Sequence, residues 1–303
     1  MSVSIGDVEQ AAGRIAGHVR RTPVIEVSPG LFMKLESLQH SGSFKARGGF
    51  NRALSAPEIP EAGLVAASGG NHGLAVAHVA RDLGVRAEIF VPTVASPVKV
   101  AGLRALGAEV TQAGAFYAEA YEMSVKRAAE TGALDVHAYD QAEVVAGQGT
   151  VGLETLEQTG GVDTVLVAVG GGGLVAGITV ALDGRARVVA VEPELIPTLN
   201  RALAAGGPVP VQVSGVGADA LGASRAGALA YEITGAAGVE SVLVTDEAIV
   251  EARRAMWRDL RIAVEHAGAA AYAALLSGAY RPAPGERVAV VVCGANTDPA
   301  TLT

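Results

Sequence analysis

The chain has 303 residues, 50% of them hydrophobic, and a formal net charge of −8. Its charged residues are scattered, which argues against nucleic acid or an anionic membrane as the main partner and favours a small neutral or zwitterionic ligand. The single cysteine, Cys293, excludes an internal disulfide and a zinc site built from cysteines, so we expect a reducing, cytoplasmic location.

No secretory signal or membrane span is expected. Residues 1–10 contain Asp7 and Glu9 and lack an apolar core. Apolar runs such as residues 163–169 are bounded by glycines and fall well short of the roughly 20 residues that a transmembrane helix needs. The length exceeds that of one usual compact domain, which predicts an enzyme-sized protein with two lobes.

Short apolar runs alternate with glycines and helix-period segments, which predicts an α/β fold with open, mostly parallel sheets and flanking helices. An amphipathic helix is predicted over residues 7–20. Another is predicted over 97–106, where proline suits the first turn, and one long or broken helix over 246–277. The predicted strands are residues 63–67, 87–91, 109–112, 164–169, 187–191, 241–244 and 287–292.

The predicted strands between residues 63 and 137 form a compact group, which suggests a small domain of residues 51–139. Residues 1–50 and 140–303 would then form a discontinuous large domain. Linker-like stretches rich in glycine and proline lie at 204–217 and 281–286. We expect the functional site in the cleft between the two domains.

Lys45 is flanked by apolar and small residues and has no carboxylate within four positions. Burial without a counter-ion disfavours the ammonium form, which is how proteins make lysine nucleophilic toward aldehydes and pyridoxal phosphate. The alternative is a surface lysine whose stem covers apolar neighbours. The other motifs of the chain decide between the two.

Four successive glycines, 170–173, follow the predicted strand over 164–169. Several backbone amides can converge there on one anion, and the dipole of the following helix adds to the attraction. A phosphate monoester therefore fits this turn. The alternative is a tight turn with no ligand, but one glycine would suffice for that.

A second turn, residues 68–73, follows the predicted strand over 63–67 and keeps polar side chains. Ser68 and the amides around Gly70 suit a carboxylate, and Asn71 offers an amide donor to a phenolate-like oxygen. Helix capping is the alternative for Ser68 and Asn71, and a structural hydrogen bond the alternative for His72.

Cys293 follows the last predicted strand, at a strand end that faces the same cleft. A thiol there can form a weak hydrogen bond with a heterocyclic nitrogen without supplying a charge. The alternative is a buried cysteine that acts as a small hydrophobic residue.

In combination these segments resemble the fold-type II pyridoxal-phosphate (PLP) enzymes, specifically the threonine and serine dehydratase group that also contains serine racemases. The match covers nearly the whole chain in family order, and the joint occurrence of its motifs is highly specific. The motifs are Thr22-Pro23, SGSFKARGGFN, SGGNHG, GQGT at 147–150, GGGGL, VEP at 191–193, EHAGAA from Glu265, and CGAN.

The resemblance implies a role for each candidate residue. Lys45 would form the Schiff base with PLP, Asn71 would meet the 3-oxygen of the cofactor, and Cys293 would face its pyridine nitrogen. The implied cofactor-binding residues are Phe44, Lys45, Asn71, Gly170, Gly171, Gly172, Gly173, Leu174 and Cys293. The implied substrate-binding residues are Ser68, Gly69, Gly70, Asn71 and His72.

The implied activity is PLP-dependent β-elimination from a small β-hydroxy amino acid, L-threonine and/or L-serine, giving a 2-oxo acid and ammonia, in a homodimer. Lys45 would remove the α-proton, and the phosphate held by the glycines would protonate the departing hydroxyl. The uncharged Cys293 would keep the ring a weaker electron sink, which favours prompt elimination.

Departures from the family pattern refine this expectation. Racemases of the group carry a second serine where this chain has Gly69, and glycine cannot deliver a proton, so dehydration is favoured over racemisation. A hydroxyaspartate dehydratase is a further alternative. Residues 213–223 contain only Asp219 where a family cation site needs an acidic pair, so no metal site is assigned. The chain ends soon after CGAN, so we expect no regulatory domain and no end-product inhibition.

Two other classes remain as alternatives. Gly171, Gly173 and Ala176 satisfy GxGxxA after a strand, and Glu192 ends the next one, a weak fingerprint of an NAD-dependent dehydrogenase. That function would leave the lysine, asparagine and cysteine described above without a shared purpose. A catalytically inactive relative that binds amino acids would carry PLP but release no ammonia.

Overall fold

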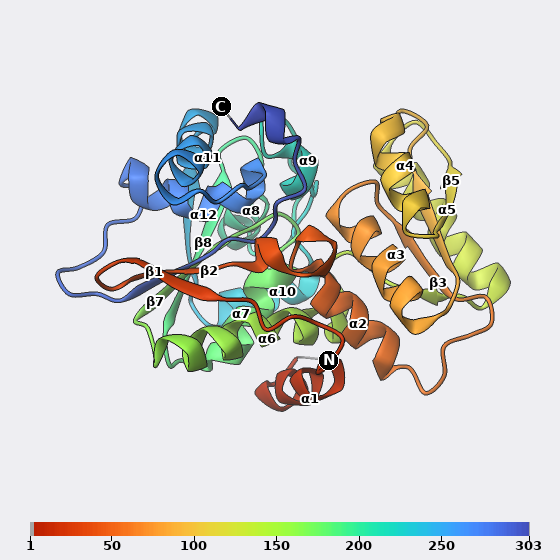
Figure 1. Ribbon diagram of the computed structural model, residues 1–303, viewed down its shortest axis with the longest axis horizontal. Coiled ribbons are helices and arrows are strands. Elements are labelled where there is room, and N and C mark those ends of the chain that lie inside the picture. Colours follow the sequence, from red (N-terminus) through yellow and green to blue (C-terminus); the bar gives the residue numbers. More distant parts are fainter. Residues whose placement is uncertain (1–2, 303) are drawn as a thin grey trace.

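The computed structural model describes residues 3–302 and contains two β-sheets with flanking helices (Figure 1). The larger sheet has six strands in the order β1-β2-β10-β7-β8-β9, parallel except for the β1–β2 pair. Its strands are β1 (Val24–Ser28), β2 (Leu31–Lys34), β7 (Thr164–Ala168), β8 (Arg187–Pro193), β9 (Glu240–Val244) and β10 (Val288–Val291).

The smaller sheet is parallel throughout and has the order β5-β4-β3-β6. Its strands are β3 (Leu64–Ala67), β4 (Ala87–Val91), β5 (Glu109–Gln112) and β6 (Leu134–Asp135). The sheet lies at the right of Figure 1 with α3, α4 and α5 around it, and the six-stranded sheet lies at the left. The expected α/β class with mostly parallel sheets is confirmed.

Twelve α-helices and three short 3₁₀ helices lie within residues 3–302. The helices are α1 (Ile5–Ile15), α2 (Lys45–Ser55), α3 (Asn71–Leu83), α4 (Pro97–Ala105), α5 (Tyr117–Thr131), α6 (Ala142–Thr159), α7 (Gly173–Leu182), α8 (Thr198–Ala205), α9 (Ala218–Leu221), α10 (Ala228–Ala236), α11 (Asp246–Leu260) and α12 (His266–Ser277). The 3₁₀ helices are η1 (Glu36–Leu38), η2 (His40–Gly42) and η3 (Pro299–Thr301). None of the helices described in this range is long and apolar enough to cross a bilayer.

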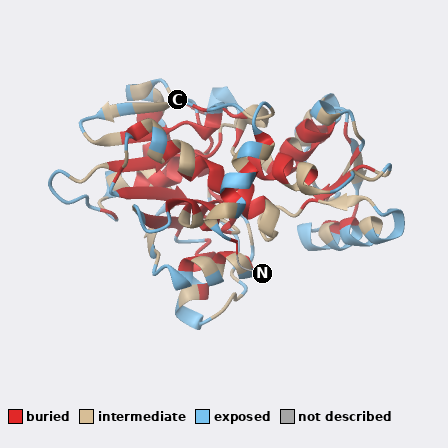
Figure 2. Ribbon diagram, turned by 90° about the horizontal axis from the view of Figure 1, so that it is seen from below, coloured by how far each residue is buried: buried red, intermediate tan, exposed pale blue. Residues whose placement is uncertain are grey.

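Buried residues gather in the strands of both sheets and on the helix faces that cover them (Figure 2). Strand β7 illustrates the cause, because every residue of its sequence TVLVA is buried. A strand covered on both faces is a nearly continuous apolar run, as is typical of parallel sheets, and Thr164 of β7 satisfies its hydroxyl by hydrogen bonds. Each sheet has its own large apolar cluster, which leaves the polar strand ends and loops to form a site.

Several predicted boundaries are wrong by a few residues, for local reasons. The first helix ends at Ile15 rather than at residue 20, because Ala16 leaves the helical conformation, with ψ 132°, and Gly17 has φ +85°. The strand predicted from residue 63 begins at Leu64, since Gly63 has φ +77° and a side chain there would collide with the carbonyl oxygen of Arg86.

The segment predicted as one long or broken helix is two helices, α11 and α12. Arg261, at φ +58°, ends α11 in the left-handed region, and residues 261–265 connect the two helices. Three strands were not predicted, namely the antiparallel β1–β2 pair and the two-residue β6.

Candidate active site

All nine residues assigned to the cofactor from the sequence line one cavity. They come from chain segments far apart in sequence, at the starts of α2 and α3, the β7–α7 turn and the end of β10. The lining residues are Phe44, Lys45, Asn71, Tyr139, Ala168, Gly170, Gly171, Gly172, Gly173, Leu174, Ala220, Leu221, Glu265, Ala267 and Cys293.

A second cavity, of about 530 Å³, adjoins the first and shares Lys45, Asn71, Tyr139 and Gly171 with it. The loop of residues 68–72, assigned to the substrate carboxylate, lines this second space. The sequence-predicted cofactor and substrate residues therefore meet around one lysine.

Lys45 is the first residue of α2, and its Nζ donates a hydrogen bond of 2.5 Å to the backbone oxygen of Ala138. The Nζ lies 5.1 Å from the centre of the Phe44 ring. Burial lowers the pKa of Lys45 to about 8, against a lesser opposing effect of Cys293. The amine is thus far easier to deprotonate than an exposed lysine.

The four glycines form a close-packed turn between β7 and α7. A Cβ atom on Gly171 would strike the ring of Tyr139, and one on Gly173 would lie 2.7 Å from the backbone oxygen of that tyrosine. Gly172 has φ +91°. Residues with side chains could not adopt this path, which leaves bare amides at the start of α7, the geometry that binds phosphate.

Asn71 begins α3 and is held on two sides. Its Nδ2 donates to Glu265 Oε1 at 2.6 Å, and its Oδ1 accepts from Asn296 Nδ2 at 2.7 Å. In the loop before it, the Gly70 amide donates to Ser68 Oγ at 3.1 Å. The amide of Asn71 therefore has a fixed orientation at the edge of the cavity.

His72 contributes differently from its neighbours. Its Nε2 lies 2.7 Å from the backbone oxygen of Val136, and burial lowers its pKa to about 3. The ring is therefore neutral at ordinary pH and occupied by a structural hydrogen bond, although the residue lines the second cavity.

Cys293 follows β10 and is buried. Its Sγ donates a hydrogen bond of 3.3 Å to the backbone oxygen of Ala267. Burial raises the pKa of the thiol well above its usual range, so the group stays uncharged. It offers the cavity a neutral sulfur rather than a thiolate nucleophile.

A comparison with family models identifies the class. Residues 15–294 match the family described as "Pyridoxal-phosphate dependent enzyme". The chain belongs to this family. PLP is therefore its cofactor, and the resemblance inferred from the motifs is confirmed.

Individual members of the family align along nearly the whole chain. L-threonine ammonia-lyase of Thermotoga maritima is 35% identical over 98% of this chain and 76% of the relative. Phenylserine dehydratase of Ralstonia pickettii is 37% identical over 99% and 96%.

Solved structures agree with the fold. Maize serine racemase superposes with a TM-score of 0.93 at 32% identity, covering 100% of this chain and 96% of the racemase. The threonine deaminase of T.th. gives a TM-score of 0.90 at 36% identity, covering 97% and 99%. The fold-type II architecture expected from the motifs is thereby confirmed.

The residues of the PLP-family site fit the chemistry of that cofactor. A lysine with a lowered pKa suits its aldehyde, bare amides at a helix start suit its phosphate, and neutral Cys293 suits its ring nitrogen. The site residues fit the alternative function, an NAD-dependent dehydrogenase, less well. Glu192, which that function would need for a ribose, is buried, and its oxygens accept from the amides of Leu199 and Asn200.

Three contacts in the PLP-family site were not predicted from the sequence motifs. The Tyr139 ring covers Gly171, Glu265 binds Asn71, and Lys99 of α4 forms an ion pair with Asp219 of α9 beside the second cavity. Glu265 was visible only as the first letter of EHAGAA. Nothing in the local sequence marks the partner of Lys99.

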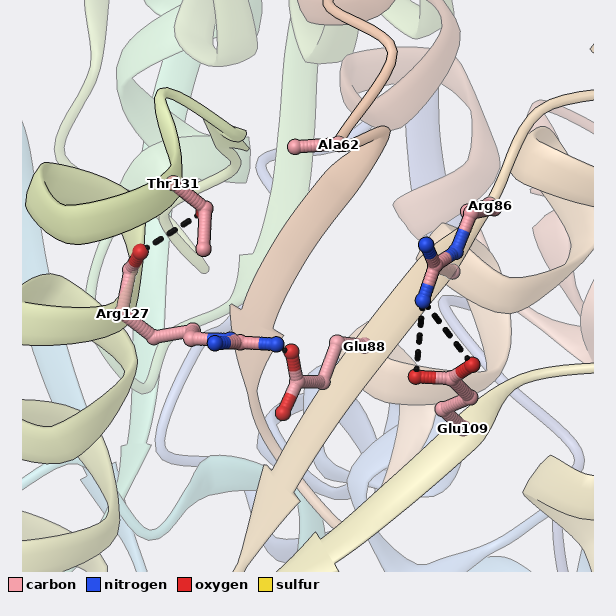
Figure 3. Close-up of a pocket in the computed structure, with 7 residues that line it drawn as sticks. Ala62, Arg86, Glu88, Glu109, Arg127 and Thr131 are labelled. Carbon is pink, nitrogen blue, oxygen red and sulfur yellow. Dashed lines mark hydrogen bonds and ion pairs between the residues drawn. The ribbon is translucent and has the colours of Figure 1, made fainter.

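Another pocket lies at the opposite ends of the strands of the smaller sheet (Figure 3). Arg86 donates two hydrogen bonds to Glu109, and Arg127 donates one of 2.7 Å to Glu88. The charges around this pocket neutralise one another in pairs. Within residues 3–302, no cluster of three or more His, Cys, Asp or Glu side chains is arranged to hold a metal ion.

Proposed function

We propose that the chain is a PLP-dependent dehydratase that converts L-threonine, L-serine or both into a 2-oxo acid and ammonia. The observation that carries the proposal is the convergence of Lys45, Asn71, the four glycines and Cys293 on one cavity beside the loop of residues 68–72. The names of the relatives, L-threonine ammonia-lyase and threonine deaminase among them, support the reaction type.

When bound, PLP supplies an electron sink that acidifies the Cα–H bond of an amino acid joined to it. The neutral amine of Lys45, favoured by burial, takes up the α-proton. The hydroxyl of Ser68 and the amides near Gly70 bind the substrate carboxylate, and the bare amides of the glycine turn hold the phosphate.

Gly69 supports dehydration over racemisation. Racemisation needs a second proton-bearing group on the opposite face of the substrate, and a residue without a side chain cannot provide one. We therefore rank serine racemisation second, although maize serine racemase superposes closely.

The charges around the second cavity favour a substrate with one carboxylate. Its lysines are Lys45 and Lys99, and Lys99 is already paired with Asp219. Binding a second carboxylate, as in hydroxyaspartate, through Lys99 would break that ion pair. Threonine and serine carry no such group.

Residues 51–139 act as a small domain against a large PLP-binding domain of 1–50 and 140–303, with the site between them. We also propose a homodimer in the cytoplasm. The single cysteine, a buried free thiol, supports a reducing compartment.

The decisive experiment is an assay of ammonia and 2-oxo acid release from L-threonine, L-serine, phenylserine and hydroxyaspartate. We expect release from threonine or serine by a coloured protein whose colour is lost with borohydride. Colour without ammonia from any of the four would instead indicate an inactive amino-acid-binding relative. A colourless protein that binds a nicotinamide cofactor would overturn the proposal entirely.

A further inference from the structure

The side-chain amide of Asn71 has only one possible orientation. The Nδ2 of Asn296 donates to the backbone oxygen of Ser41 at 2.8 Å and also to Asn71 Oδ1. A carboxylate oxygen of Glu265 accepts from Asn71 Nδ2 on the other side. Because the Asn296 amide nitrogen only donates, the atom of Asn71 that faces it must be the oxygen, so the oxygen and nitrogen of Asn71 cannot exchange places.

Two glycines make room for this chain of hydrogen bonds. A Cβ atom on Gly294 would collide with Glu265 Oε1 and lie 3.2 Å from Asn71 Nδ2. A Cβ atom on Gly42 would lie 2.5 Å from Asn296 Oδ1. The backbone around these side chains is therefore shaped to hold them close together.

Glu265 is 7% exposed and, among residues 3–302, has no cation in ion-pair contact. The charged groups that face it more distantly are Asp219, Lys99 and Arg253, and burial raises its pKa to about 7. A carboxyl group in such a place costs stability. Glu265 lines the cofactor cavity itself, and there its carboxylate accepts a hydrogen bond from Asn71.

We infer that Glu265 is a positioning residue, which fixes the Asn71 amide so that its second N–H is presented to the cofactor cavity. The Asn71 Nδ2 has two hydrogens, and Glu265 accepts one of them. The other remains available to an oxygen bound in the cavity. This role rests on the family's cofactor and on the place of Asn71 in its site, and it does not depend on which amino acid is the substrate.

The experiment measures PLP binding without substrate, by fluorescence titration of the apoprotein. The variants are Glu265→Ala, Asn71→Ala and the double variant, with Glu251→Gln on the exposed face of α11 as the control. We expect Glu265→Ala to weaken PLP binding roughly tenfold, the size expected for losing a hydrogen bond to a charged group. In the Asn71→Ala background the same change should have less than about a twofold effect.

The pH dependence of the visible spectrum gives a second readout. Wild-type holoenzyme should show a spectral step near pH 7, where Glu265 loses its proton, and Glu265→Gln should lack that step. Glu265→Gln keeps the size of the side chain and carries the binding test if Glu265→Ala does not fold. Equal losses in both Asn71 backgrounds, or a step that persists in Glu265→Gln, would overturn the inference. A failure of dehydratase activity alone would leave it standing.

Discussion

Lys45 Nζ and the backbone oxygen of Ala138 are joined by a 2.5 Å hydrogen bond between the start of α2 and the segment that leads into α6. That segment continues into Tyr139, whose ring lies over Gly171 of the glycine turn. One short stretch therefore contacts both the reactive amine and the phosphate-binding turn.

Replacement of Lys45 by alanine should abolish both cofactor attachment and turnover. Without the amine, nothing in the cavity bonds to the aldehyde or takes up the α-proton, so activity should fall by a factor on the order of 10³ or more. Visible absorbance and ammonia release measure the two effects. Lys126→Ala, on the exposed face of α5, serves as the control and should behave as wild type. Steady activity in the Lys45 variant would contradict the assignment.

The rate at which apoprotein takes up PLP should increase with pH. Only the neutral amine attacks an aldehyde, and the pKa of Lys45 is about 8, so the reactive fraction rises as the pH passes through that value. The growth of visible absorbance, followed from about pH 6 to about pH 10, measures this rate. A rise centred near the ordinary value of a free lysine, about 10.4, would show that the amine is not desolvated.

Gly69→Ser should introduce some serine racemisation. A Cβ atom at this position meets Val91 and Lys99 at 3.7 and 3.8 Å, which is ordinary contact, so the protein should fold. The new hydroxyl would supply a proton donor on the second face of the substrate. Chiral chromatography of serine incubated with the variant measures the product. No gain of D-serine would indicate that the opposite face needs further residues.

Gly171→Ala should damage the cofactor site and the fold together. The added methyl group collides with the Tyr139 ring, and overpacking of this kind costs about 1–3 kcal/mol. Thermal unfolding and PLP titration measure the two effects. Gly102→Ala in α4 is the matched control, because its Cβ meets only Leu74, at 3.7 Å. The control should retain PLP binding. If Gly171→Ala affects stability and PLP binding as little as the control does, the close packing at Gly171 is contradicted.

Cys293→Ser should retain most activity, since a hydroxyl can replace the neutral thiol and still donate to Ala267. Cys293→Asp should change the products, because a carboxylate would strengthen the electron sink and favour reprotonation over elimination. The ratio of 2-oxo acid to pyridoxamine phosphate measures this balance. If the aspartate variant gives the wild-type ratio, the electronic argument fails.

Local pattern was sufficient for much of the fold. The strands predicted at 87–91 and 109–112 have those bounds in the structure, because short β-rich runs between turn residues carry their own signal. The β1–β2 pair was missed since its first strand is half-exposed and lies at a sheet edge. The pairing of β2 with β10 joins segments more than half the chain apart, and hydrophobic periodicity cannot predict such long-range pairing.

The site likewise contains residues that local motifs predict and a contact that they do not. Lys45, the four glycines and Cys293 sit within motifs that describe their own surroundings, so they could be assigned from sequence. Glu265 and Asn71 are 194 positions apart, and their contact joins the residue that precedes α12 to the first residue of α3. Such a contact has no local signal, and it became visible only in three dimensions.

The position of β10 between β2 and β7 determines when each sheet can be completed. The smaller sheet uses only residues between 64 and 135, so a nascent chain can assemble it while translation continues. The amino-terminal hairpin has no place in the larger sheet until residues 288–291 leave the ribosome. The lysine loop, which follows that hairpin, therefore acquires its final surroundings only after residues 288–291 have been synthesised.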